Sequence, residues 1–166
     1  MDNPAGLAST DLPQMTELLS GAPRQALNLI IVAPDIAAIT QALGQDWQAA
    51  PRPSVPVLAA AVFDDWTGRA LPDPLVIPTF WDNRPSTMGY TQPAPVDDLR
   101  LHLRIWDSLY RTPDSEVIYA ATITQEHPLD WADAEDAIAP PGPDVPASLD
   151  AVIAALNAAG LRGLRP

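Results

Sequence analysis

Four residues suited to binding or proton transfer occupy every second position of one short segment. Arg100, His102, Arg104 and Trp106 alternate with leucine and isoleucine between residues 98 and 106. Because alternate residues of a β-strand project from the same face, we expect these four side chains to share one surface. Guanidinium groups bind anions through forked N–H donors, and a histidine can change its charge near neutral pH. The segment therefore predicts a stripe able to bind an anion.

A second segment, residues 116–125, is placed to enlarge this stripe. It is rich in β-branched residues and follows a turn, which is typical of the second strand of a hairpin. If the register aligns the two polar faces, Thr122, Thr124 and Glu126 lie beside the arginines and His102. A shift of one residue would move them to the opposite face. These residues complete the ligand-binding candidates that the two strands provide.

The same alternation is also typical of an ordinary half-buried strand. In that interpretation the leucines pack on the core, while the polar side chains face water and pair with nearby acids. Exposed ion pairs of this kind contribute only about 0–1 kcal/mol each, so they need no function to explain them. On the sequence alone, both interpretations stay open.

Other polar groups are weaker candidates for a site. Glu126, His127 and Asp130 are close in sequence, but a turn with acidic residues explains them more simply than a metal site does. The aspartate pairs at 64–65 and 97–98 are adjacent, and neighbours in a helix or strand do not share a face. We therefore expect no metal, no cofactor and no carboxylate pair. The common nucleotide-binding, nucleophile-elbow and zinc-protease motifs are absent from the sequence.

Charge and composition exclude broad classes of function. The 166 residues carry nine arginines, no lysine and 21 acids, for a net charge of −12. General nucleic-acid binding requires a basic footprint, so we expect no nucleic-acid partner. The absence of cysteine excludes disulfides and thiolate metal centres. The sequence has no secretory leader and no apolar run near the roughly 20 residues of a membrane span. We expect a soluble, cytoplasmic protein, or one held at a membrane by a partner.

The chain as a whole predicts a single α+β domain, with a mostly antiparallel sheet and helices packed on one face. Within it, residues 1–25 are expected to be loose, with a short helix capped by Asp11. A core over residues 26–137 follows. A proline-rich linker at 138–147 then leads to a C-terminal helix and tail at 148–166, with Ser148 as the cap.

Individual elements of the core follow from periodicity and end signals. The apolar run at 27–33 predicts a buried strand, and Pro34 to Gly44 predicts a helix after it, with Pro34 at the first helical position. A second helix is predicted from Ser54 to Gly68. Residues 75–81 predict another strand, and Pro78 within it favours an edge position.

Several strings, taken together, resemble the LssY C-terminal domain family. Residues 78–85 read PTFWDNRP, residues 92–93 read QP, and residues 100–106 read RLHLRIW. Members of that family carry a similar R-P segment, a nearby Q-P and an R-x-H-x-R-[LI]-W strand. The resemblance covers about residues 26–127. It adds Arg84 to the candidate residues of the stripe.

The resemblance implies a bacterial domain of unestablished activity, often joined to membrane-embedded phosphatase-like segments. This sequence contains no membrane portion, and its segment after His127 is proline-rich and lacks the combined histidine and acidic run often seen downstream in the family. The family motif is matched at Arg84, Arg100, His102, Arg104 and Trp106. Association with a membrane protein is the partnership that the resemblance implies.

Three functions are compatible with these observations. The first is a binding or accessory domain that recognises an anionic small molecule, a lipid headgroup or a partner protein through the arginine stripe. The second is a hydrolase of phosphate or acyl esters, with His102 as general base and arginines stabilising negative charge. The third is an assembly module that uses Trp106 and a sheet edge near Pro78.

Overall fold

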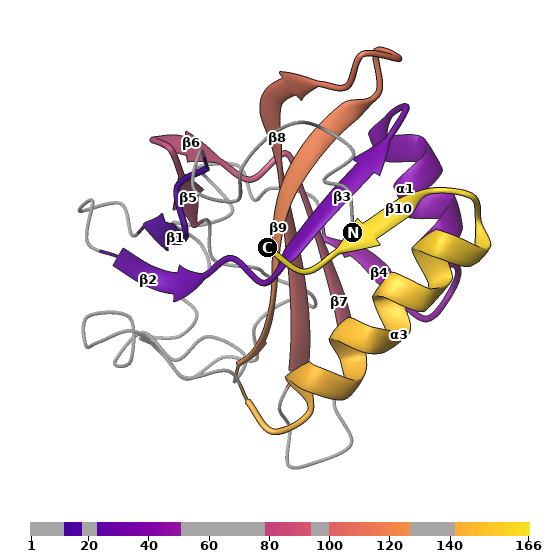
Figure 1. The fold of residues 1–166 in the computed structure, drawn as a ribbon. Helices are drawn as coiled ribbons and strands as arrows, with labels where there is room; N and C mark the ends of the chain where they lie inside the picture. The colour runs from indigo at the N-terminus through magenta and orange to yellow at the C-terminus, as the bar shows by residue number, and fades with distance from the viewer. Residues whose placement is uncertain (1–11, 18–22, 51–78, 94–99, 127–141) are drawn as a thin grey trace.

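A computed structural model describes residues 12–17, 23–50, 79–93, 100–126 and 142–166. The described strands form a six-stranded and a four-stranded sheet, and every strand pair in both is antiparallel (Figure 1). The predicted α+β class is confirmed. In chain order the elements are β1 (Met15–Glu17), β2 (Pro23–Ala26), β3 (Leu29–Ala33), α1 (Ile36–Leu43), β4 (Gln48–Ala50), β5 (Phe80–Trp81), β6 (Arg84–Pro85), β7 (Met88–Pro93), β8 (Arg100–Arg111), β9 (Val117–Glu126), α3 (Val145–Ala158) and β10 (Arg162–Leu164).

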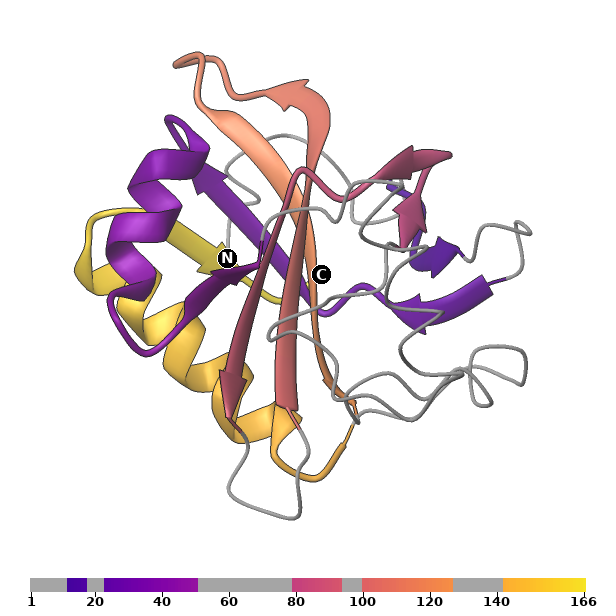
Figure 2. The ribbon, with the colours of Figure 1, turned by 180° about the vertical axis from the view of Figure 1, so that it is seen from behind.

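The six-stranded sheet has the order β10-β3-β9-β8-β7-β4, with the long β8–β9 hairpin at its centre. Helices α1 and α3 lie against one of its faces, and the four-stranded sheet lies on the opposite side (Figures 1 and 2). The predicted hairpin is therefore confirmed. It is placed between two layers, so both of its faces can be covered.

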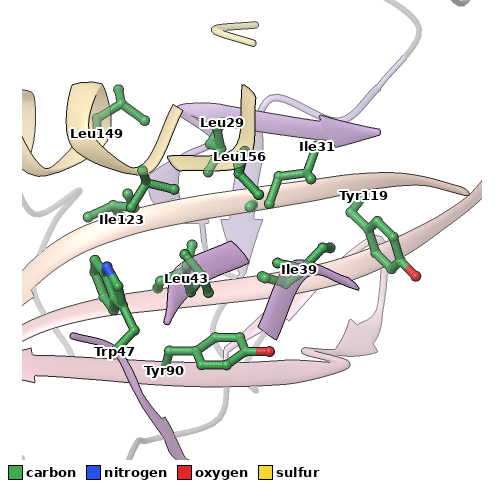
Figure 3. Close-up of a cluster of buried hydrophobic side chains, with 14 of the residues drawn as sticks. Leu29, Ile31, Ile39, Leu43, Trp47, Tyr90, Tyr119, Ile123, Leu149 and Leu156 are labelled. Atoms are coloured by element: carbon green, nitrogen blue, oxygen red, sulfur yellow. The ribbon is translucent and has the colours of Figure 1, made fainter. Parts of the chain in front are cut away.

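The face of this sheet that meets the helices carries the larger apolar core (Figure 3). Three odd-numbered residues in the first half of β8, Leu101, Leu103 and Ile105, point into it and are at most 3% exposed. They meet Leu149 and Leu156 of α3 within one cluster. The leucine side of the alternation therefore packs as the sequence predicts.

Strand β3 and helix α1 follow the predicted order. The side chain of Asp35 caps α1 by accepting a hydrogen bond of 2.8 Å from the backbone N–H of Ala38. Gly44 ends the helix with a φ of +66°, a conformation that glycine adopts at little cost. Pro34 was expected at the first helical position, but it precedes the Asp35 cap because an aspartate carboxylate can satisfy the free N–H groups of the first turn.

Helix α3 begins earlier than the sequence predicts. It starts at Val145, with Asp144 at the N-cap position and a proline in the first turn. The predicted cap, Ser148, therefore lies inside the helix. A proline fits the first turn because the N–H that it lacks has no partner within the helix there. The linker predicted up to residue 147 thus overlaps the start of α3, and β10 after the helix was not predicted.

The four-stranded sheet has the order β2-β1-β5-β6 and corrects one prediction. Within the described residues 12–17 the helix expected after Asp11 is absent, because Met15–Glu17 forms the strand β1. This strand pairs with β2 on one side and with β5 on the other, and those pairings satisfy its backbone groups. Three residues are too few for hydrophobic spacing to distinguish a helix from a strand.

Part of the sequence-based scheme lies outside the described residues. This applies to the helix predicted from Ser54 to Gly68 and to most of the strand predicted at 75–81, of which Phe80–Trp81 is β5. Within the described ranges, no helix is both long enough and apolar enough to cross a membrane.

Candidate functional site

The polar side of β8 is buried, which differs from the half-buried strand that alternation predicts. Arg100 is partly exposed, but His102 is 4% exposed, and Arg104 and Trp106 are each 1% exposed. Trp106 packs in a second apolar cluster with Trp81 of β5. The strand is therefore buried on both faces, and at Trp106 the four-stranded sheet packs on the side expected to meet water. We call His102, Arg104, Trp106, Thr122 and Thr124 the inter-sheet face.

The register of the hairpin brings the two predicted polar rows together. His102 is directly opposite Thr124, and Arg104 is directly opposite Thr122. The same register places Arg100 opposite Glu126. The alignment of faces on which the candidate site depends is therefore present. Glu126 is placed by its backbone position alone.

Arg104 is the central charged group of this face. Its Nη1 donates to the Thr124 hydroxyl at 3.1 Å, and its Nη2 lies 3.5 Å from Nδ1 of His102. A guanidinium only donates, so Nδ1 of His102 is the acceptor in this contact. A neutral His102 ring then carries its proton on Nε2. That arrangement makes Nε2 a hydrogen-bond donor and leaves Nδ1 engaged by Arg104.

Thr122 has a structural partner. Its hydroxyl donates to the backbone carbonyl of Ala26 at 3.1 Å, which ties β9 to the end of β2. Its single proton is therefore already used. Of the two threonines predicted to bind a ligand, Thr124 is the one in contact with Arg104.

Three buried donors on this side of the sheet lack an acceptor among the described residues. They are Nε of Arg24 in β2, the indole N–H of Trp106 and the hydroxyl of Thr79, which is 0% exposed. Leaving a buried polar group without a partner costs about 1–3 kcal/mol. The Trp106 indole can only donate, so it requires an acceptor atom. The stripe predicted from the sequence includes Trp106 but not Thr79. Neither spacing nor residue type indicates which hydroxyl is left without a hydrogen-bond partner by tertiary packing.

Arg84 lies elsewhere. It donates to the carbonyl of Asp107 at 3.0 Å and to the Asp82 carboxylate at 3.1 Å. Its guanidinium is 5.5 Å from the ring centroid of Trp81, a cation–π contact. These partners lie in β5, in the turn between β5 and β6, and at Asp107, the residue after Trp106. The structure therefore does not bring Arg84 into contact with Arg104, and the single stripe predicted from the family motif divides into two places.

The group near Arg84 is an exposed charge network. Arg111 donates to both carboxylate oxygens of Asp107, at 3.0 and 3.1 Å. Burial alone would raise the pKa of Asp107. The hydrogen bonds from Arg111 and the Leu109 N–H, with the charges of Arg111 and Arg84, outweigh burial and lower that pKa. This network fixes the end of the hairpin and has no apparent reactive group.

Metal binding finds no support in the described parts of the chain. Those parts contain no group of three or more histidine, aspartate or glutamate side chains placed to hold a metal ion. Of the weak candidate set, His127 and Asp130 lie outside the described residues.

Comparison with known families identifies the domain. The family model described as LssY C-terminus matches residues 9–161. The chain belongs to the LssY C-terminal family. Among curated proteins and among solved structures, nothing matches it. The matched range of this LssY C-terminal domain includes both strands of the inter-sheet face and ends before β10.

Proposed function

We propose that this LssY C-terminal domain is a ligand-binding accessory domain that holds a small anionic molecule between its two sheets. Arg104 is its main anion contact, and the Trp106 indole N–H is a further donor. The observation that carries the proposal is the Trp106 N–H, which is sealed in the interior without an acceptor among the described residues, two positions along the strand from a buried guanidinium.

Physical chemistry favours an anion at this place. Charge-assisted hydrogen bonds from a guanidinium are about twice as strong as neutral ones, and a low-dielectric interior strengthens them further. Thr124 and His102 hold the guanidinium in a fixed orientation. Exposure falls along β8 from Arg100 to Arg104, so we expect an anion to enter from the Arg100 end.

The other two expected functions gain no support. A hydrolase with His102 as general base needs a ring nitrogen that can accept a proton from water, and Nδ1 of His102 already accepts from Arg104. An assembly module would require Trp106 at the surface, whereas the Trp106 side chain is 1% exposed. We therefore retain the binding function alone.

The proposal is tested by calorimetric titration of the folded domain with inorganic phosphate and with glycerol phosphate. Arg104→Gln removes the charge from the inter-sheet face, and Arg165→Gln removes the same charge from the surface, where Arg165 pairs with Asp150. We expect Arg165→Gln to bind like the parent and Arg104→Gln to bind at least about tenfold more weakly. Equal affinity of the parent and Arg104→Gln would refute the proposal.

A second variant guards against a folding defect in Arg104→Gln. Trp106→Phe removes the indole N–H and keeps an aromatic ring in the cluster. Losing a hydrogen bond to a charged acceptor weakens binding by about 1.5–3 kcal/mol, or roughly tenfold to a hundredfold. Circular dichroism confirms that each variant is folded before titration. Unchanged phosphate affinity in folded Trp106→Phe would exclude the indole from the site.

A further inference from the structure

A groove of about 280 Å³ lies on the other side of the six-stranded sheet, between the end of α1, the strand β7 and helix α3. It is separate from the inter-sheet face, because the sheet itself lies between them (Figures 1 and 2). Its volume is close to the lower limit of small-molecule pockets. The residues that line it are Leu43, Asp46, Trp47, Gln92, Ala147, Ser148, Ala151, Val152 and Ala155.

Trp47 is the residue that points to a ligand. It is only 8% exposed and belongs to the helix-side core, yet it also lines the groove. Its indole N–H has no acceptor among the described residues, and unlike that of Trp106 it is not enclosed. In Figure 3 the indole nitrogen lies at the end of the ring on the side of Leu149 of α3. Trp47 is therefore a nine-tenths buried tryptophan that lines the groove, and its one polar atom has no partner among the described residues.

The opposite wall is shaped to leave space for a molecule. Ala147, Ala151 and Ala155 occupy positions i, i+4 and i+8 of α3 and so lie on one face of the helix. Because alanine side chains are small, this face of α3 leaves the groove open. With Leu43 and Val152 they give it an apolar wall.

The remaining polar groups define the chemistry of the occupant. Ser148 offers a hydroxyl and Gln92 an amide, and each can donate and accept. Asp46 supplies a carboxylate, and no arginine is among the described residues that line the groove, so an anion would be repelled. Groups that both donate and accept suit hydroxyls, which do the same. A molecule with hydroxyls on its edge and C–H groups on its face matches both the polar edge and the apolar wall.

We propose that this groove binds a neutral polyhydroxyl molecule of monosaccharide size, with a hydroxyl oxygen accepting from the Trp47 indole N–H. The Asp46 carboxylate accepts a hydrogen bond from a hydroxyl of the sugar at the open side. The alanine wall contacts the C–H face of the sugar ring. The site is independent of the anion site, so either can fail without the other.

The test uses nuclear magnetic resonance of the indole N–H signals of the whole chain, with the Trp47 signal assigned by its loss in Trp47→Phe. The probes are glucose and N-acetylglucosamine, with inorganic phosphate and ethanolamine as charged comparisons. For a ligand of this size we expect a Kd on the order of 1 mM. Either sugar should shift the Trp47 signal, and both charged probes should shift it less.

Two matched substitutions on α3 test the place of binding. Ala151→Leu fills the groove from an exposed helix position, and Ala154→Leu adds the same side chain at an exposed position outside it. Leucine is a good helix former, so both variants should fold. We expect Ala151→Leu to weaken sugar binding at least about tenfold and Ala154→Leu to leave it unchanged. The proposal is overturned if neither sugar shifts the signal at about ten times that Kd, if phosphate or ethanolamine shifts it more, or if Ala151→Leu binds as well as Ala154→Leu.

Discussion

At the scale of single residues, two buried hydroxyls in or beside the four-stranded sheet differ in whether they have a partner. Thr16 and Thr79 are both 0% exposed. The Thr16 hydroxyl lies 3.1 Å from both the carbonyl oxygen and the backbone nitrogen of Gln25, so it joins β1 to β2. The Thr79 hydroxyl has no partner among the described residues. The same chemical group therefore stabilises the fold at one position and costs free energy at the other.

This contrast predicts opposite effects of the same substitution. Thr79→Val removes an unsatisfied hydroxyl and keeps the shape, so the free energy of unfolding should rise by about 1 kcal/mol. Thr16→Val removes a hydroxyl that bonds to Gln25, so the free energy of unfolding should fall by about 1–2 kcal/mol. Urea denaturation of both variants and the parent measures the two changes. A loss of stability in Thr79→Val would mean that its hydroxyl has a partner in solution.

At the scale of elements, the end of the β8–β9 hairpin stores backbone strain. Leu109 has a φ of +68° and is 69% exposed, a conformation that leucine rarely adopts. The backbone N–H of Leu109 donates to the Asp107 carboxylate at 2.7 Å, and the regular pairing of β8 with β9 shifts in this region. The irregularity bends the strand, and Asp107 holds it in place.

Relief of this strain is testable. Leu109→Gly removes the Cβ that disfavours a positive φ and loses almost no buried surface, so we expect the free energy of unfolding to rise by about 0.5–1 kcal/mol. Leu109→Ala keeps a Cβ and should not show this gain. Thermal and urea denaturation of the parent and the two variants measure the change in the free energy of unfolding. If alanine and glycine have the same effect, the left-handed conformation carries no strain.

Asp107 makes the stability of this hairpin end depend on pH. Its folded pKa is lowered, so its contribution is present above the ordinary value of 3.8 and is lost as the pH falls through the lower folded value. We expect Asp107→Asn to cost less than about 1 kcal/mol at pH 7, because the ion pair with Arg111 is exposed. The difference from the parent should disappear at acidic pH. Denaturation midpoints at neutral pH and near pH 3 compare the two proteins, and a difference that grows on acidification would contradict the assignment.

The sequence predicts the elements of the large sheet better than those of the small one. The alternation in β8 and the β-branched composition of β9 predict the hairpin, because each strand is long enough for period two to be visible. The register stays open on the sequence alone, and the structure resolves it. Strands β1, β5 and β6 have three, two and two residues, which is too short for any periodicity. The packing of Trp81 on Trp106 was for that reason not predicted, and a stripe expected at the surface is buried.

At the scale of the whole molecule, the six-stranded sheet separates two kinds of interior. The helix side is apolar, and the polar side-chain atoms of its cluster are the hydroxyls of Tyr90 and Tyr119 and the indole nitrogen of Trp47 (Figure 3). The inter-sheet side contains a buried arginine, a histidine and two threonines. The apolar and the polar interior thus lie on opposite faces of one sheet, and the sheet separates the proposed anion site from the proposed sugar groove.

The apolar side makes the whole fold sensitive to alkali. Burial raises the pKa of Tyr90 above its ordinary 10.0, although a hydrogen bond of 2.6 Å with Thr40 opposes it, and burial and the Asp107 charge raise that of Tyr119. A raised folded pKa gives stability that is complete below pH 10 and is lost as the pH rises through the folded values. We expect the urea midpoint of the parent to fall above pH 10. Tyr90→Phe loses the hydrogen bond to Thr40, so its midpoint at pH 8 should be lower than that of the parent. Above pH 10 its midpoint should fall less steeply than the parent's. Urea titrations at pH 8, 10 and 11 provide the comparison. Equal slopes in the two proteins would show that Tyr90 ionises as readily in the folded chain as in the unfolded one.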